Sequence, residues 1–290
     1  MSASSRVWLV TGSSSGFGLT ICKLALERGN KVVATLRRPS DLDELARQYP
    51  PNALLVVQVD VTEPDDIASA FRAAKARFGR VDVVFNNAGT SLIGEVEGVP
   101  DADARRLMDV DFWGAAAVSR EAVRFFREDN PRGAGGTLLV MSSSSGHCAV
   151  ASMGYYCAAK FALEGLSEAL ALELDPAWNI KVCIIAPGFF RTQIGAKTPT
   201  VPVHPAYAAV ERVQASRGIW ERAGDPARSM RVGDVEKAGR AIYEVSTLEQ
   251  VPLRLFLGTG CIERVRRRQE RLGVDLDASV KWSEDLQENE

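Results

Sequence analysis

The stretch RVWLVTGSSSGFG, from Arg6 to Gly18, carries the strongest structural signal in this chain. Its first part, Arg6 to Thr11, is a short apolar and β-branched run that is typical of a buried parallel strand. A glycine-rich turn follows, and then a helical pattern that reaches Gly29, a residue type that often ends helices. Strand, glycine turn and helix in this order predict a phosphate-binding loop, because glycines allow close approach and a helix N-terminus offers unpaired N–H groups.

Strand-like and helix-like segments alternate along the rest of the chain, which indicates a parallel sheet with helices on both faces. The expected strands are Val7 to Thr11, Lys31 to Leu36, Leu54 to Asp60, Val81 to Asn86, Thr137 to Ser142, Lys181 to Ala186 and Leu253 to Leu257. The clearest expected helices are Asp65 to Phe78, Ala102 to Glu128 and Tyr156 to Leu174. We therefore expect a single doubly wound α/β domain over residues 1–290.

Two parts of the chain depart from this regular alternation. Residues 191–231 form a long insertion with several prolines and glycines around a short helix-like piece, Pro205 to Ser216. Insertions of this length are usually functional or disordered. Residues 259–290 follow the last expected strand as a C-terminal extension.

Composition excludes several classes of function. The chain has 35 Lys and Arg against 37 Asp and Glu, so no broad basic field for nucleic acid is expected. The five cysteines are scattered without CxxC pairing, which indicates reduced thiols and no metal site. The first residues, MSASSR, lack the apolar core of a signal peptide, and no segment approaches the ~18 apolar residues of a membrane span. We expect a cytoplasmic protein.

Ser143, Tyr156 and Lys160 form a candidate catalytic group. Tyr156 and Lys160 are four residues apart, so on a helix they share one face. An unperturbed tyrosine has a pKa near ~10, and a neighbouring cation lowers it, which makes the phenol a usable proton donor. The run from Gly135 to Gly146 predicts a strand that ends in a hydroxyl-rich turn, with Ser143 at the mouth of the sheet. A Tyr–Lys pair four residues apart and a serine turn after a strand also occur by chance. The catalytic interpretation therefore depends on the glycine turn at the start of the chain.

Taken together, these motifs resemble those of the short-chain dehydrogenase/reductase family. The matching elements are the T-G-x-x-x-G-x-G pattern from Thr11 to Gly18, the N-N-A-G run from Asn86 to Gly89, Ser143, the pair Tyr156 and Lys160, and the segment from Pro187 to Thr192. They keep the family's order over roughly residues 5–260, with the glycine spacing of its compact branch. The resemblance implies a Rossmann-type fold and hydride transfer between a nicotinamide cofactor and a carbonyl or alcohol, with residues 191–231 as a lid over the substrate.

The resemblance also implies which residues bind the cofactor. They are Gly12, Ser13, Ser15, Gly16, Phe17, Gly18, Asp60, Val61, Asn87, Ala88, Gly89, Tyr156, Lys160, Pro187, Gly188 and Thr192. Leu36 stands where NAD-dependent members carry an acid for the ribose 2′-hydroxyl. Arg37 and Arg38 follow it, and guanidinium groups can pair with a 2′-phosphate, to which Ser13 could donate as well. This favours NADPH, with a solvated loop end as the alternative role of the two arginines.

Catalytic roles follow from the same resemblance. Ser143 would hydrogen-bond the carbonyl oxygen, Tyr156 would deliver the proton, and Lys160 would lower the tyrosine pKa. Asp111 departs from the pattern, because the family has asparagine at this position beside the lysine. Its carboxylate can accept the same hydrogen bond, but its charge offsets the effect of Lys160 on the tyrosine. A non-catalytic NADPH-binding regulatory protein is the alternative that this substitution leaves open.

Fuller runs of sequence resemble the subgroup that contains 17β-hydroxysteroid dehydrogenase type 1 and retinol-type carbonyl reductases, which implies a lipophilic ketone, aldehyde or alcohol as substrate. Those runs are Val32 to Thr35, Pro187 to Thr192 and Gly233 to Ala238. The expected substrate contacts are Ser143, His147, Tyr155, Phe189 and Ile194, although a lone histidine after a glycine, such as His147, is more often a loop residue.

Assembly and lid closure complete the expectations. The helices Ala102 to Glu128 and Tyr156 to Leu174 match those that pair in many relatives, so we expect a homodimer or a higher homo-oligomer. Phe112, Trp113, Ala116, Val123 and Phe126 supply apolar area on the first of them. In the lid, we expect an inward-facing apolar set of Val201, Val203, Tyr207, Val210 and Trp220.

Overall fold

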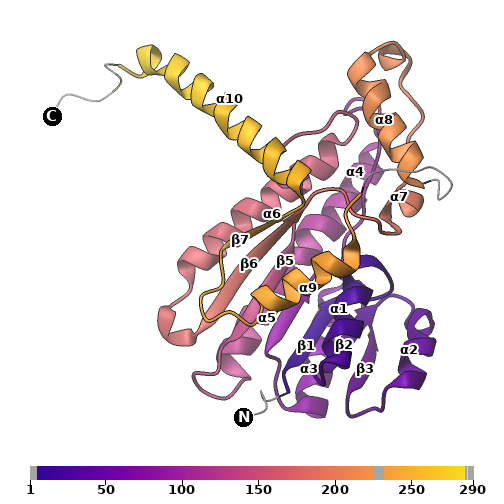
Figure 1. The fold of residues 1–290 in the computed structure, drawn as a ribbon, viewed down its shortest axis with the longest axis vertical. Helices are drawn as coiled ribbons and strands as arrows, with labels where there is room; N and C mark the ends of the chain where they lie inside the picture. The colour runs from indigo at the N-terminus through magenta and orange to yellow at the C-terminus, as the bar shows by residue number, and fades with distance from the viewer. Residues whose placement is uncertain (1–4, 225–231, 285, 287–290) are drawn as a thin grey trace.

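Parallel strands form the centre of the molecule, and helices cover both of its faces (Figure 1). The computed structural model describes residues 5–224, 232–284 and 286. Within these residues the sheet has seven strands in the order β3-β2-β1-β4-β5-β6-β7. They are β1 (Val7–Thr11), β2 (Lys31–Leu36), β3 (Leu54–Gln58), β4 (Val83–Asn86), β5 (Gly136–Met141), β6 (Ile180–Pro187) and β7 (Arg254–Leu257). Every expected strand is present, and only their ends differ, which confirms the doubly wound fold.

The order of the strands reverses at β1, which pairs with β2 on one side and β4 on the other. In open sheets of this kind, ligands bind outside the carboxyl ends of the strands at such a reversal. The glycine turn after β1, the end of β4 and the serine turn after β5 all meet there. Sequence segments that lie far apart are therefore brought to one edge of the sheet.

Two apolar clusters lie on the two faces of the sheet. Side chains alternate along β1, so that Trp8 and Val10 face one cluster whereas Val7 and Leu9 face the other. The helices are α1 (Gly16–Glu27), α2 (Asp43–Gln48), α3 (Pro64–Phe78), α4 (Asp101–Met108), α5 (Ala115–Glu128), α6 (Gly154–Glu173), α7 (Ile194–Lys197), α8 (Glu211–Gly224), α9 (Val235–Val245) and α10 (Thr259–Ser283). Because both faces are buried, the strands read as continuous apolar runs.

The expected helix from Ala102 to Glu128 is interrupted. Between α4 and α5 the chain forms the π-helical segment η2 (Asp109–Gly114). At its end, a Cβ on Gly114 would lie 2.8 Å from the carbonyl oxygen of Val61, so the backbones are in close contact. Asp111 lies inside this wider turn and is fully buried. Single π turns are common at functional sites, and this one points a carboxylate into the protein.

The insertion also differs from its expected form. The helix-like piece Pro205 to Ser216 is instead a short 3-10 turn, η5 (Pro205–Tyr207), followed by the longer helix α8. Pro205 occupies the first position of η5, and α8 begins only at Glu211, whose carboxylate suits a helix N-terminus. The last part of the expected lid, residues 225–231, lies outside the described residues.

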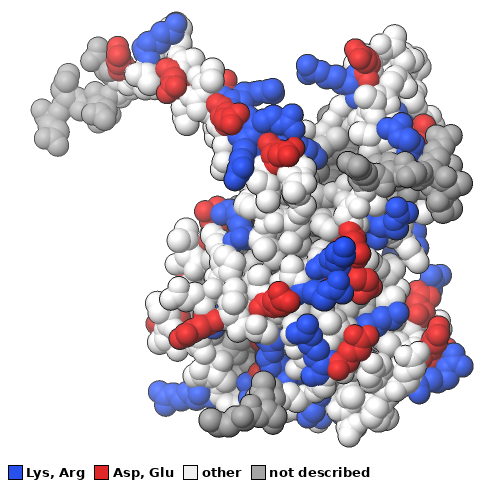
Figure 2. Space-filling view, in the orientation of Figure 1, with Lys and Arg blue, Asp and Glu red and all other residues white. Residues whose placement is uncertain are grey.

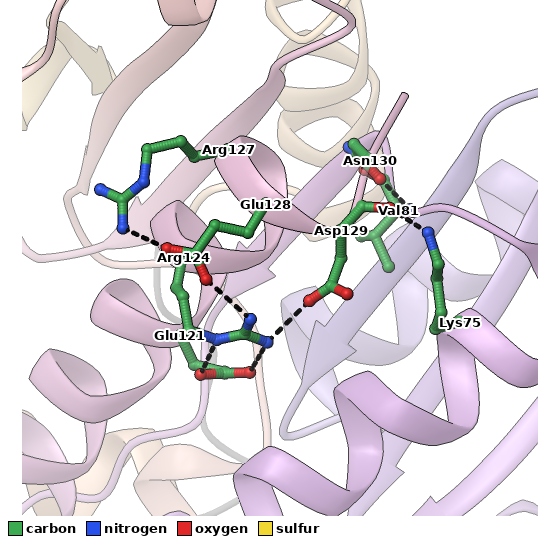
Figure 3. Close-up of polar contacts among 8 residues, drawn as sticks. All are labelled: Lys75, Val81, Glu121, Arg124, Arg127, Glu128, Asp129 and Asn130. Atoms are coloured by element: carbon green, nitrogen blue, oxygen red, sulfur yellow. Dashed lines mark hydrogen bonds and ion pairs between the residues drawn. The ribbon is translucent and has the colours of Figure 1, made fainter. Parts of the chain in front are cut away.

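Polar contacts hold the C-terminal end of α5 to the amino end of the sheet (Figure 3). Arg124 pairs with Asp129 at 2.8 Å and also with two glutamates of its own helix. Asn130 accepts from the N–H of Val81 at 3.1 Å and donates to its carbonyl oxygen at 2.6 Å. Lys75 of α3 donates to the carbonyl oxygen of Asp129. These hydrogen bonds and ion pairs join α3, α5 and the segment before β4 at the amino end of the sheet. The carboxyl ends of the strands lie at the opposite end.

The C-terminal helix α10 extends away from the body (Figure 1). Its first turns pack against the protein through the buried residues Cys261 and Val265. Its far half exposes large apolar side chains, namely Leu272, Val274, Leu276, Val280 and Trp282. Figure 2 shows Lys and Arg gathered on the part of α10 nearest the body, whereas both signs are mixed elsewhere on this face. Within the described residues, no helix has the length and apolar character needed to cross a membrane.

Candidate active site

A cavity of about 750 Å³ opens at the carboxyl ends of the strands. Its wall runs from the glycine turn after β1, past the ends of β2, β4, β5 and β6, to the first turns of α6. Fifteen of the residues expected to bind the cofactor line it: Gly12, Ser15, Gly16, Phe17, Arg37, Asp60, Val61, Asn87, Ala88, Gly89, Tyr156, Lys160, Pro187, Gly188 and Thr192. The fold thus gathers residues from most of the chain around a single space.

The glycine turn has the geometry that a phosphate requires. Gly12 and Gly16 have φ angles of +68° and +55°, in the left-handed region that other residues rarely adopt. The N-cap of α1, Ser15, makes no side-chain hydrogen bond to the helix, and the first turn carries no acid. The N–H groups at this end of α1 therefore remain available to an anion.

Two members of the glycine motif lie outside the cavity wall. Ser13 is fully buried, its hydroxyl donates to the carbonyl oxygen of Val10 at 2.9 Å, and its N–H donates to Thr35 at 3.1 Å. In this structure its hydroxyl is therefore bonded inside the protein and does not line the cavity where a 2′-phosphate was expected. Gly18 has a packing role, because a Cβ there would lie 2.3 Å from the carbonyl oxygen of Gly12.

The two arginines after β2 have different environments. Arg37 lines the cavity beside Leu36. Arg38 points to solvent, with its side chain 77% exposed, and pairs with Asp41 at 3.3 Å. Of the two guanidinium groups expected to select the cofactor, the structure brings only Arg37 to the cavity.

Ser143, Tyr156 and Lys160 meet at one end of the cavity. Ser143 caps the short turn η3 (Ser144–Gly146) after β5, and its Oγ accepts from the N–H of Ser145 at 3.1 Å. Tyr156 and Lys160 lie one turn apart on α6, both buried, with the ammonium 5.7 Å from the centre of the tyrosine ring. The strand end and the helix therefore hold the three groups in one place, as their spacing predicts.

Burial raises the pKa of Tyr156 above its ordinary range, the Lys160 ammonium opposes this rise, and the Asp111 carboxylate adds to it. A hydrogen bond with Ser143 also lowers the tyrosine pKa. Lys160 thus acts in the expected direction, but the net shift is upward, because loss of water around the phenolate outweighs the cation.

Asp111 contacts Lys160 directly. Its Oδ2 lies 3.1 Å from Nζ of Lys160, and its Oδ1 accepts from the N–H of Thr90 at 2.7 Å. Burial raises the pKa of Asp111, although the Lys160 ammonium opposes this rise. Burial also lowers the pKa of Lys160, but the negative charges of Asp111 and Tyr156 outweigh this effect, and the pKa of Lys160 rises. We take the pair as carboxylate and ammonium, since the Lys160 ammonium and the N–H of Thr90 both favour the charged form of Asp111. Lys160 also donates to the carbonyl oxygen of Met141 at 3.3 Å.

Among the expected substrate contacts, Ser143, Phe189 and Ile194 line the cavity, whereas His147 and Tyr155 do not. His147 lies 3.1 Å from Glu164 of α6, which in turn pairs with Arg254 of β7 at 3.0 Å. It therefore links the serine turn to the helix behind it, and the loop interpretation is the one that the structure supports. Tyr155 packs against the apolar cluster that contains Met153 and Tyr156, without lining the cavity itself.

The insertion is attached to the body by an ion pair that sequence reasoning missed. Arg217 of α8 donates to both carboxylate oxygens of Glu95, at 2.7 and 2.8 Å, and both side chains are buried. Ser152 and the N–H of His204 donate to the same carboxylate. The partners are separated by more than a hundred positions, and no local pattern marks either of them.

The apolar residues of the insertion divide between the interior and the surface. Trp220 lines the cavity and stacks edge-on against Phe189, with ring centres 5.3 Å apart. Val201 packs against the cluster behind the cavity. Val203 and Val210 are exposed, and Tyr207 is half-buried beside His204, so only part of the expected inward set faces the site.

The chain matches the family model described as short chain dehydrogenase over residues 6–201. An uncharacterised oxidoreductase of Schizosaccharomyces pombe is 36% identical over 95% of this chain and 89% of its own length. A 3-ketodihydrosphingosine reductase of Bacteroides thetaiotaomicron is 34% identical over 64% of this chain and 65% of its own length. The crystal structure of a short-chain dehydrogenase from Streptomyces avermitilis superposes with a TM-score of 0.85, at 35% identity over 98% of both chains.

With this fold, this site and these relatives, the chain belongs to the short-chain dehydrogenase/reductase family. It is an oxidoreductase of that family, and its polar triad lies at the switch point of a Rossmann-type sheet.

Proposed function

We propose that the protein is an NADPH-dependent oxidoreductase that reduces a lipophilic ketone or aldehyde to an alcohol, or catalyses the reverse reaction. The observation that carries this proposal is the convergence of Ser143, Tyr156 and Lys160 on one end of a cavity whose wall also contains the glycine turn. A proton donor and a phosphate-binding loop in one space are what a nicotinamide-dependent reductase needs.

In the proposed reaction, Ser143, Tyr156 and Lys160 have different roles. The bound nicotinamide supplies the hydride for the carbonyl carbon. Ser143 donates a hydrogen bond to the carbonyl oxygen, and Tyr156 transfers its phenolic proton to that oxygen as negative charge develops on it. The ammonium of Lys160, held 3.1 Å from Asp111, stabilises the phenolate that remains. The carbonyl gains one hydride and one proton, which gives the alcohol.

The preference for NADPH is supported by the end of β2. An apolar residue, Leu36, stands where an acid would bind a 2′-hydroxyl, and Arg37 lines the cavity beside it. A guanidinium can bind a phosphate through two charge-assisted hydrogen bonds.

A lipophilic substrate is supported by the apolar part of the wall. Val150, Met153, Phe189, Ile219 and Trp220 line the cavity. A bacterial relative is named as a reductase of 3-ketodihydrosphingosine, a ketone by its name, which is compatible with a ketone substrate here.

We also propose a cytoplasmic location, which the five cysteines support, because all are buried and unpaired.

The alternative is a regulatory protein that binds NADPH without turnover. Two observations favour it, namely the carboxylate of Asp111 beside the catalytic lysine and the raised pKa of Tyr156.

Tyr156→Phe tests both functions, because it keeps the ring and removes the transferable proton. We expect turnover of a lipophilic ketone to fall by orders of magnitude while NADPH binding, measured by calorimetry, persists. Tyr155→Phe, one residue away and outside the cavity, is the matched control and should stay active. An active Tyr156→Phe variant would overturn the assignment of the proton donor. NADPH binding by the unmodified protein with no turnover of any carbonyl would favour the regulatory function.

A further inference from the structure

The cavity wall includes a charged side chain, Arg264, that has no role in the proposed reaction. Arg264, from the first turns of α10, lines the cavity and is half-buried. Its Nη1 lies 3.5 Å from the hydroxyl oxygen of Ser144, and its Nη2 lies 3.4 Å from the carbonyl oxygen of Cys148. Both acceptors are neutral, and both distances are at the long limit of hydrogen bonding.

Two other guanidinium groups, both largely buried, have carboxylate partners. Arg217 binds Glu95 through two bonds, and Arg254 pairs with Glu164 and Glu168. For Arg264 no ion pair is found among residues 5–224 and 232–284. A guanidinium carries five N–H donors and stays charged at any physiological pH, and burying such a charge without a partner is costly. Its remaining donors are therefore available to an anion in the cavity.

The position of Arg264 indicates where this anion would lie. Ser144 directly follows Ser143, and consecutive Cα atoms are only ~3.8 Å apart. The guanidinium is thus at the same end of the cavity as the residue that would hold the reacting carbonyl. Val150 and Met153, which line the same space, give this end an apolar surface.

We propose that Arg264 binds an anionic group of the substrate, and that the substrate is an oxo acid, a carbonyl compound with an apolar body and a carboxylate near the reacting carbonyl. A planar guanidinium matches a carboxylate through two parallel hydrogen bonds, which gives orientation as well as affinity. This inference rests on the proposed function, because it names the class of carbonyl compound that the same site accepts.

The test compares compounds that keep the same ketone and differ at the carboxyl group, with NADPH as the reductant. They are β-benzoylpropionate, its methyl ester and butyrophenone, which share one aryl ketone. We expect kcat/KM for the acid to exceed that for the ester by about tenfold or more, as a charge-assisted bond provides. Arg264→Gln should remove this preference by raising KM for the acid while the ester changes little. Arg264→Lys should restore part of it.

Arg267→Gln is the matched control, since it removes the same charge from the same helix at an exposed position that does not line the cavity. It should retain the preference for the acid. NADPH affinity is measured as well, because a cofactor phosphate is the other anion that the guanidinium could bind. If Arg264 binds the substrate instead, NADPH affinity should be equal in all variants. A selective loss of NADPH affinity in Arg264→Gln would assign the residue to the cofactor and overturn the inference.

Two further outcomes separate this inference from the proposed function. Equal kcat/KM values for the acid, the ester and the ketone would reject the proposed role of Arg264 and leave the reductase function intact. An equal fall of kcat/KM for all three in Arg264→Gln would have the same meaning. If no ketone is turned over, calorimetric binding of β-benzoylpropionate to the NADPH complex still decides the matter. Binding of the acid that Arg264→Gln abolishes and Arg267→Gln retains would support the role of Arg264, while the proposed reaction fails. Binding of the acid that does not change in Arg264→Gln would reject this role.

Discussion

At the residue scale, one buried ion pair controls the proposed proton donor. Asp111 holds the ammonium of Lys160 at 3.1 Å, and its carboxylate also raises the pKa of Tyr156. The same residue therefore fixes the cation and weakens its effect on the phenol. An asparagine would position the lysine without adding negative charge.

Asp111→Asn should consequently shift the pH dependence of the reaction. Alcohol oxidation requires the phenolate, so its rate rises as the pH passes upward through the pKa of Tyr156. Without the carboxylate this pKa is lower, and the rise should move to lower pH. The pH profile of kcat/KM for oxidation measures the shift, and Asp109→Asn, an exposed change two residues away, should leave the profile in place. A shift to higher pH would show that holding Lys160 in position matters more than the carboxylate's own charge.

Arg37 and Arg38 give a second test at this scale. Arg37→Gln should weaken NADPH binding by about tenfold or more and leave NADH binding nearly unchanged, because one charge-assisted contact to the 2′-phosphate is lost. Arg38→Gln should have little effect on either cofactor, since this side chain points to solvent and pairs with Asp41. Equal affinity of the unmodified protein for NADH and NADPH would contradict the proposed preference.

At the scale of elements, a buried ion pair between Arg217 and Glu95 helps to attach helix α8 to the body. The Arg217 guanidinium lowers the pKa of Glu95 to about 2, although burial works against this. The stabilisation is therefore fully present above the ordinary carboxyl pKa of 4.5 and is lost as the pH falls towards 2. Trp220, three residues after Arg217, is held against Phe189 on the cavity wall by the same attachment.

Arg217→Met should release this helix. The variant leaves the Glu95 carboxylate buried without its partner, a change that typically costs ~3–5 kcal/mol of unfolding free energy. Amide hydrogen exchange in α8 should become faster, while exchange in β1 and β4 stays slow. The double variant with Glu95→Gln removes the buried charge and should recover part of the loss. Unchanged exchange in α8 would show that apolar packing alone holds the insertion.

At the scale of the whole molecule, the apolar surface that remains exposed bears on assembly. Among the residues expected to supply a dimer contact, Ala116, Val123 and Phe126 are buried inside the domain, and only Trp113 is widely exposed, at 62%. On α6, Phe161 and Leu172 are exposed on one helix face. Gly165 lies between them with no atom near its Cβ position, so a second helix could approach closely there.

A homodimer through these helices remains the expected assembly. Light scattering at micromolar concentration should give twice the chain mass for the unmodified protein. Leu172→Glu, which places a charge in the contact, should shift the protein towards the monomer without unfolding it. Leu248→Glu, at an exposed apolar residue in the segment between α9 and β7, is the control and should remain dimeric. A monomeric unmodified protein would refute this assembly.

The residue pattern alone predicts the architecture and most of the candidate site. Burial on both faces forces parallel strands into continuous apolar runs, so β1 and its neighbours are visible in the residue pattern. The glycine turn and the step from Tyr156 to Lys160 are short-range features whose geometry the local backbone dictates. The ends of elements were less predictable, as the π turn at Asp109–Gly114 and the start of α8 at Glu211 show.

The remaining features depend on contacts between distant segments, which only the tertiary structure brings about. It buried Ser13 and turned Arg38 to solvent while Arg37 stayed on the cavity wall. Packing of α10 brought Arg264 next to Ser144, and packing of α8 brought Arg217 to Glu95. Burial also outweighed the neighbouring cation in setting the pKa of Tyr156. Desolvation and long-range pairing depend on which surfaces meet in three dimensions, and no local pattern of residues encodes that.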